Sequence, residues 1–334
     1  MHRFFRGDSV KQKSFWTGTG ICFGMLVLIL DGKTALDGAR QGIALCLKTV
    51  IPSLFPFFVL SILLTSSLMG RSMAALRPFG RLFGLPAGAE SLLIPAFLGG
   101  YPVGAQTVAA AFRNGQLPRQ EAERLLSFCS NAGPAFLFGM AGSMFPSRWM
   151  AWALWGIHIC GALFASLLIP GKRGKSVTPA GGQALSPSSA LNAALRVMAS
   201  VCGWVVLFRV ILAFLGRWVL WLLPGAAQVA IAGLLELSNG CCALPAVQDI
   251  SARFCICSGM LSFGGLCVTM QTRSVTEGLS MRLYLLGKLL QTLFSLAFAL
   301  LIMYGVWLPF GVTVLAALLV KIQKKSSFSP AFGV

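Results

Sequence analysis

Long apolar stretches separated by short polar or basic segments dominate the sequence. A helix needs about 20 apolar residues to cross the hydrocarbon core of a bilayer. Candidate spans are 15–30, 50–69, 147–169, 197–223, 281–306 and 308–320. Two further regions, 89–145 and 226–272, are apolar but are interrupted by Gly, Pro, Ser and Asn. The pattern predicts an all-α polytopic membrane protein.

Composition supports this fold class. Of the 334 residues, 56% are hydrophobic and only 11% are charged, whereas soluble domains carry about 25% charged residues. The formal net charge of +18 could indicate a nucleic-acid partner. However, the cytoplasmic loops of membrane proteins also collect Lys and Arg, so we expect membrane lipid and no nucleic acid as a partner.

The basic residues predict an orientation. They cluster at 3–13, 71–81, 113–124 and 172–175, and again around Arg273, Arg282 and Lys288 and after residue 320. If all of these clusters lie inside, region 89–145 must cross the membrane an odd number of times. We therefore predict a re-entrant hairpin at 89–113, followed by a crossing that is broken between Ser130 and Pro134.

The second half predicts the same parts in the opposite orientation. Segment 197–223 crosses outward, 226–249 forms a hairpin, and 251–272 crosses inward. The result is about eight transmembrane helices plus two re-entrant helical hairpins in an inverted-topology repeat, as in many secondary transporters. The predicted parts are 1–49 (N-terminal cytoplasmic tail, first transmembrane helix and outside loop), 50–169 (first repeat), 170–190 (basic cytoplasmic linker), 191–306 (second repeat) and 307–334 (last transmembrane helix and cytoplasmic tail).

Four breaks in the apolar segments, at residues 99–105, 130–136, 236–242 and 262–266, are candidates for a shared site. Unpaired backbone in hydrocarbon is costly unless protein or a wet cavity satisfies it. We expect Pro134 to start a half-helix, with Ser130 and Asn131 as caps, and its N-terminus can bind an anion. One break alone could be a simple kink, but four at paired positions favour a central site. The candidate substrate-binding residues are Gly100, Pro102, Gly104, Gln106, Ser130, Asn131, Gly133, Pro134, Arg209, Glu236, Ser238, Asn239, Ser262, Gly264, Gly265 and Gln271.

Few ionisable groups are expected at membrane depth. Glu236 is the one acid that the spans place deep, where a charge is costly and usually functional. It could carry a coupled proton or cation, or pair with Arg253 or Arg217. Arg209 could attract an anionic substrate, snorkel to the interface, or pair with Glu236. His158 is predicted to be a packed, hydrogen-bonded residue rather than a ligand.

No enzyme constellation is present in the sequence. It has no Walker loop, no nucleophile–His–acid set and no paired carboxylates on one helix face. The ten cysteines are scattered without the spacing or His partners of a zinc site. We expect no catalytic residues, no cofactor, no metal and no structural disulfide.

Several segments together resemble a known family. They are IPSLFPFFVLS (51–61), FLGGYPVGAQ (97–106), RLLSFCSNAGPAFLFGMAG (124–142), GLLELSNG (233–240) and SFGGLCVTMQ (262–271). These segments resemble the YlbJ-type sporulation integral membrane proteins, within the wider nucleoside-recognition or Gate domain group. The resemblance implies passage of dipicolinate from the mother cell across the outer forespore membrane.

The residues and the resemblance lead to one main hypothesis and two alternatives. The main one is a membrane transporter of a small organic anion, which the resemblance implies to be dipicolinate, with cytoplasmic N- and C-termini. The alternatives are a non-transporting scaffold or regulator of sporulation, and a nucleoside or cation permease of the Gate group. Substrate identity, coupling ion and self-association are left open by the sequence.

Overall fold

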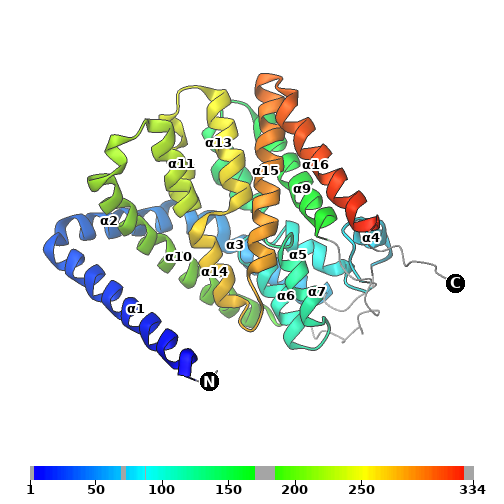
Figure 1. Ribbon diagram of the computed structural model, residues 1–334, viewed down its shortest axis with the longest axis horizontal. Helices are drawn as coiled ribbons and strands as arrows, with labels where there is room; N and C mark the ends of the chain where they lie inside the picture. Colours follow the sequence, from blue (N-terminus) through cyan, green and yellow to red (C-terminus); the bar gives the residue numbers. More distant parts are fainter. Residues whose placement is uncertain (1–3, 69–72, 87, 170–184, 327–334) are drawn as a thin grey trace.

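The computed structural model describes residues 4–68, 73–86, 88–169 and 185–326, and over these ranges the chain forms helices and turns without a strand (Figure 1). The all-α prediction is therefore confirmed for this part of the protein. Most of the predicted linker, residues 170–184, lies outside the described residues.

Within these ranges, five helical segments are long and apolar enough to cross a membrane. They are Gly32–Leu68, α9 (Arg148–Leu168), α10 (Pro187–Trp218), α13 with α14 (Ile250–Val275) and α15 (Arg282–Tyr304). Shorter apolar segments lie in α1 (Phe4–Leu30) and α16 (Trp307–Ser326). The predicted apolar stretches are thus helices, while the count of eight spans stays a prediction.

An outside loop is predicted before residue 50, but residues 32–49 form helix instead. Helix α2 (Gly32–Leu45) continues through a π-helical turn (Cys46–Val50) into α3 (Ile51–Leu68). A Cβ at Gly42 would lie 2.9 Å from the Cα of Val206, which shows that α2 packs closely on α10. Asp37, Arg40 and Gln41 make this segment look like a polar loop in the sequence.

The first interrupted region folds into a helical hairpin and a broken helix. Helices α5 (Leu93–Phe97) and α6 (Val103–Arg113) form the hairpin, which turns at residues 98–102. Helix α7 (Arg119–Leu126) ends at the break, and α8 (Pro134–Phe136) begins after it. Helical turns then continue to Met144. As predicted, Pro134 starts a half-helix.

The second interrupted region repeats this order of parts. Helices α11 (Gly225–Leu235) and α12 (Leu237–Ala243) form its hairpin, and α13 (Ile250–Phe263) and α14 (Gly265–Val275) form its broken helix. Long helices precede and follow each set, namely α3 and α9 in the first half and α10 and α15 in the second. Whether the hairpins re-enter a bilayer and the halves are inverted stays a prediction.

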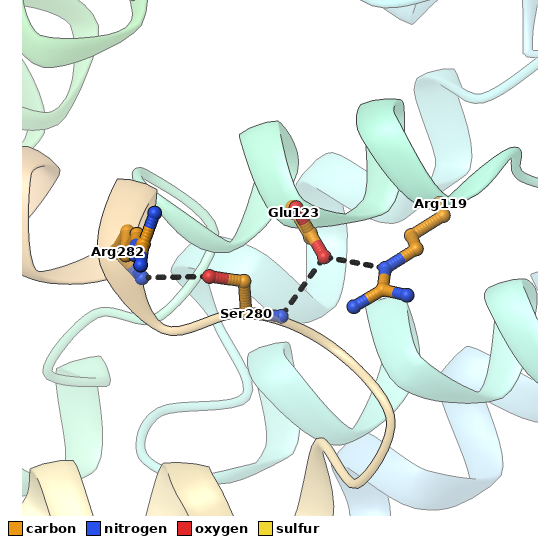
Figure 2. A network of polar contacts seen from close by, with 4 residues as sticks. All are labelled: Arg119, Glu123, Ser280 and Arg282. Atoms are coloured by element: carbon orange, nitrogen blue, oxygen red, sulfur yellow. Dashed lines mark hydrogen bonds and ion pairs between the residues drawn. The ribbon is translucent and has the colours of Figure 1, made fainter. Parts of the chain in front are cut away.

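A polar contact joins α7 to the loop that precedes α15 (Figure 2). The Oε1 atom of Glu123 accepts hydrogen bonds from Arg119 Nε at 2.8 Å and from the backbone N–H of Ser280 at 2.9 Å. The Ser280 hydroxyl in turn accepts from the backbone N–H of Arg282 at 3.3 Å. This contact positions α15 beside the broken helix of the first half, where the candidate site lies.

Candidate functional site

One central cavity is lined by residues from three of the four breaks and from α14, which follows the fourth break. Its wall includes Gly99, Gly100 and Tyr101 of the first hairpin, Gly133 and Ala135 of the first broken helix, Glu236 and Ser238 of the second hairpin, and Val268 and Gln271 of the second broken helix. Helices α3 and α10 close the cavity with Phe57, Phe58, Val201 and Val205. Of the predicted site residues, Gly100, Gly133, Glu236, Ser238 and Gln271 line this cavity directly.

The two breaks of the first half touch each other through backbone. A Cβ added at Gly133 would lie 2.9 Å from the Cα of Gly100, and Gly100 has a φ of +72° that disfavours any other residue. A Cβ added at Gly104 would come closer still to the carbonyl oxygen of Cys129. Only glycines allow this approach, so the candidate residues Gly100, Gly104 and Gly133 have a shared packing role beside the cavity.

Side chains of α9 and α15 satisfy the polar groups of the break at residues 127–133. His158 Nε2 accepts from the backbone N–H of Ala132 at 3.1 Å, which agrees with the predicted packed histidine. Gln291 Nε2 donates to Asn131 Oδ1 at 3.1 Å, and the ammonium group of Lys288 donates to the Ser130 carbonyl. Side chains of neighbouring helices therefore provide hydrogen-bond partners for the polar groups of the break.

The predicted caps of the Pro134 half-helix are wrong. Gly133 occupies the N-cap position, and no side chain bonds to the first turn. The Asn131 amide instead donates to the carbonyls of Phe128 at 2.6 Å and Ala96 at 3.2 Å. Because this side chain is drawn toward the preceding turn and α5, the first N–H groups of the half-helix receive no side-chain acceptor from it.

Lys288 is the main residue that the sequence analysis missed. It was assigned to a cytoplasmic basic cluster, but its side chain is fully buried and donates to Tyr101 Oη and Gln291 Oε1, each at 3.0 Å. Tyr284, Lys288, Gln291 and Ser295 are all 0% exposed and recur at a spacing of four, three and four residues. This polar stripe within an apolar helix was the available signal, since it indicates one face turned toward protein.

Glu236 serves as the cap of α12. Its carboxylate accepts from the backbone N–H of Ser238 at 3.0 Å, and from the backbone N–H and side-chain amide of Asn239, both at 2.7 Å. The alternative pairings with arginine are wrong. Arg253 instead donates to the carbonyls of Val247 and Met144, and Arg217 pairs with Asp31 at 3.4 Å.

Glu236 is not alone among buried acids. Glu90 and Glu121 are 6% and 5% exposed, and Glu121 lies 3.6 Å from Arg124. Both belong to the first half of the chain, and neither lines the central cavity. Glu236 therefore differs from them by lining the central cavity, and not by burial alone.

The glycine pair at the fourth break connects both hairpins. Gly264 and Gly265 have φ values of +83° and +81°, a conformation that favours glycine. A Cβ at Gly264 would lie 3.1 Å from Tyr101 Oη, and one at Gly265 would lie 2.9 Å from the Gly233 carbonyl. Gly264 therefore lies against Tyr101 of the first hairpin, while Gly133 lies against Gly100.

The remaining predicted site residues are divided between the breaks and two other cavities. Pro102, Ser130, Asn131, Ser262, Gly264 and Gly265 are buried near the breaks but do not line the central cavity. Gln106 lines a cavity between α3 and α6. Arg209 and Asn239 line a third cavity beside α2 and α11. Gln106 and Gln271, predicted to share one site, line different cavities in this structure.

The central cavity is nearly closed in this conformation. Its volume is about 40 Å³, which is enough for a few water molecules, whereas a cavity of about 150 Å³ accepts benzene. Phe57 and Phe58 of α3 and Tyr101 of the first hairpin line the space. An aromatic ligand could enter only after these walls move apart.

Comparison with known proteins supports a membrane role in sporulation. The chain is 25% identical over 331 aligned positions to the sporulation integral membrane protein YlbJ of Bacillus subtilis (strain 168), an alignment that covers 84% of this chain and 81% of that protein. No family model matches the chain, and no solved structure matches it. The similarity extends over most of both proteins and agrees with the apolar helices described above. This chain is therefore similar, over most of its length, to a sporulation integral membrane protein of the YlbJ type.

Proposed function

We propose that the protein transports a small organic anion across a membrane during sporulation and that the central cavity is its binding site. The observation that carries the proposal is the meeting of three breaks, and of the helix α14 that follows the fourth, at this one cavity. Broken helices at membrane depth are tolerated where they line a cavity, and transporters place their sites at such breaks. A single structural kink would not require this convergence.

The charges near the cavity favour an anion. The Glu236 carboxylate is held by three N–H donors at the start of α12. Lys288 has only neutral oxygen partners among the described residues, and Tyr101, which lines the cavity, is one of them. A buried cation without a carboxylate partner attracts an anion strongly, because the low local dielectric weakens screening.

The proposed substrate is dipicolinate, and the proposed place is the outer forespore membrane with both termini of the chain in the cytoplasm. Dipicolinate is a flat aromatic dicarboxylate, so cationic and N–H donors suit its two charged groups, while Phe57, Phe58 and Tyr101 supply aromatic walls. Since the closed cavity is too small for an aromatic ring, transport requires alternation between open states. We propose no catalytic role and no cofactor for the chain.

Uptake into proteoliposomes tests the proposal directly. Wild-type protein should accumulate radiolabelled pyridine-2,6-dicarboxylate above empty liposomes, and excess unlabelled dicarboxylate should compete. A nucleoside and a monovalent cation serve as alternative substrates in the same assay. Uptake of either one in place of the dicarboxylate would assign the permease function and overturn the anion proposal.

A deletion strain separates transport from a scaffold role. Spores that lack the protein should contain little dipicolinate, although the mother cell still synthesises it. Complementation with Gly133→Leu, which should insert in the membrane but block the cavity, should fail to restore the spore content. Full restoration by this variant would contradict a transport role and favour a scaffold or regulator.

A further inference from the structure

Two larger cavities flank the central one. The first, called here the Arg209 cavity, has a volume of about 530 Å³ and is lined by Gln41, Arg209, Gly216, Gln228, Asn239 and Cys242 among others. The second, called the Gln106 cavity, has a volume of about 350 Å³, and its wall includes Thr65, Ser66, Gln106, Asn114 and Ala193. Both exceed the central cavity in size and fall in the range of small-molecule sites.

The three cavities follow one another along α10. Ala193 lines the Gln106 cavity, Val201 and Val205 line the central cavity, and Arg209 and Gly216 line the Arg209 cavity. From Ala193 to Gly216 the helix rises about 35 Å at roughly 1.5 Å per residue. This length is close to the bilayer core of about 30 Å, so the series of cavities spans the width of a membrane.

The continuous segment formed by α2 and α3 lines the same series in reverse order. Gln41 and Leu45 belong to the Arg209 cavity, Leu54 and Phe58 to the central cavity, and Thr65 to the Gln106 cavity. Two antiparallel walls therefore run past all three spaces. Asn239 lines the Arg209 cavity, and Glu236 lines the central cavity. The side-chain amide of Asn239 donates to the Glu236 carboxylate, so this hydrogen bond lies at the junction of the two cavities.

Arg209 gives its cavity an unbalanced positive charge. The half-buried guanidinium donates to the neutral Oε1 of Gln41, and no ion pair joins it to a carboxylate among the described residues. Arg217, two turns further along α10, is paired with Asp31 at 3.4 Å. A guanidinium has five N–H donors in a planar fork that matches a carboxylate, and one bond to Gln41 leaves most of them available.

We propose that the Arg209 cavity is a second binding site, specific for small carboxylate anions, and that it is the vestibule of a path through the central cavity to the Gln106 cavity. The path rests on the proposed transport function. The vestibule site itself rests on the volume, the arginine and the amides of Gln41, Gln228 and Asn239. Because the central cavity is closed, an anion in the vestibule would wait there until the centre opens.

A native thiol in the vestibule makes the site testable without transport. Cys242 is exposed and lines the Arg209 cavity. A variant that keeps Cys242 as its only cysteine is labelled in nanodiscs with two impermeant methanethiosulfonates, one anionic and one cationic. The ratio of the two labelling rates cancels the intrinsic reactivity of the thiol and reports the local charge. Pyridine-2,6-dicarboxylate is then added as the probe anion.

The expected result depends on Arg209 alone. In Arg209→Gln the anionic-to-cationic rate ratio should fall by about fivefold or more, and the dicarboxylate should no longer protect Cys242. Arg209→Lys should restore the ratio but only part of the protection, because an ammonium lacks the planar fork. The matched control is Arg217→Gln, which removes the same charge from the same helix at a paired position and should leave both readouts within about twofold of wild type.

Two outcomes would overturn the proposal. One is a rate ratio that Arg209→Gln leaves unchanged, and the other is an absence of dicarboxylate protection in the single-cysteine protein. Loss of proteoliposome uptake with intact protection of Cys242 would remove the transport function but leave the binding site. Normal uptake without protection would remove the vestibule site and leave the transport function.

Discussion

The ammonium group of Lys288 lies 3.0 Å from the hydroxyl of Tyr101, and this contact joins α15 to the loop that lines the central cavity. Tyr101 Oη donates onward to the carbonyl of Leu261 at 3.2 Å. Lys288 also bonds to the Ser130 carbonyl. One buried side chain therefore connects the first hairpin and the first broken helix to α15, while the tyrosine reaches the second broken helix.

Replacing Lys288 should impair both stability and transport. Lys288→Met keeps the apolar stem but leaves the oxygens of Ser130, Tyr101 and Gln291 without a donor, at a cost of about 1–3 kcal/mol. We expect a lower melting temperature in detergent and loss of dicarboxylate uptake. Lys33→Met changes an exposed lysine of α2 and should leave both measurements unchanged. Wild-type uptake in Lys288→Met would contradict a role for this charge in anion binding.

The close approach of Gly133 and Gly100 predicts a position-specific effect of alanine. The φ of Gly133 is −76°, so the limit there is space rather than backbone conformation. Gly133→Ala should separate the two loops, reduce uptake severely and destabilise the protein by about 1–3 kcal/mol.

Gly139→Ala is the matched control for Gly133→Ala. Its Cβ would meet only Ser53 at an ordinary 3.8 Å, so activity should stay close to wild type. Uptake rates normalised to inserted protein decide the comparison. Equal effects of the two alanines would refute a special role for the contact between the loops.

Two helix caps of the same geometry should differ in their importance. Glu236→Ala leaves three buried N–H donors of α12 without an acceptor, so the free energy of unfolding should fall by about 2–3 kcal/mol. Asp249 caps α13 through Ser251 and Ala252 in the same way but is exposed, so water can replace its carboxylate. Asp249→Ala should therefore cost clearly less in a thermal or denaturant unfolding series. The reverse order of stabilities would show that Glu236 is not a stabilising cap.

The Glu123 contact in Figure 2 predicts a pH dependence of stability. Burial raises the pKa of this carboxyl, but hydrogen bonds from Arg119 and the Ser280 backbone outweigh it, so the pKa is lowered from its usual 4.5. The folded pKa lies below the unfolded one. The stabilisation is therefore present above pH 4.5 and is lost as the pH falls through the folded pKa.

Melting temperature measured in nanodiscs across this acidic range checks the sign. Wild type should lose stability toward low pH, whereas Glu123→Gln should start lower and show a flatter profile. Arg119→Gln removes one donor to the same carboxylate and should flatten the profile in part. An identical pH slope in all three proteins would exclude this contact as a source of the dependence.

The predicted orientation can be tested independently of the substrate. Pro78, Pro146 and Gly225 are all exposed, so single cysteines at these positions are expected to react with an impermeant maleimide. Position 78 should be labelled from the cytoplasm, and positions 146 and 225 from the opposite side. Gly174, which should label with position 78, lies outside the described residues. Labelling of positions 78 and 225 from the same face would remove the inverted arrangement.

Local properties of the sequence determined the helices and most of the breaks. Apolar length predicts α9, α10 and α15 because a spanning helix needs a continuous apolar run. Pro134 predicts a helix start because its missing N–H and fixed φ suit only the first turn. These features depend on neighbouring residues alone, so they could be identified before any contact was known.

Only the tertiary structure decided which residues meet. Lys288 and Ser130 are 158 residues apart in the chain, and a rule that places basic residues in cytoplasmic loops cannot distinguish a loop lysine from one buried against a distant break. For the same reason, the sequence did not show that Arg209 and Gln106 line cavities other than the central one. Nor did it show that Asn131, predicted to be a cap, is a hydrogen-bond partner of Gln291. Packing selects these partners through backbone approaches at Gly42, Gly100 and Gly133, because the space between two helices is a property of the pair and is not encoded in either segment alone.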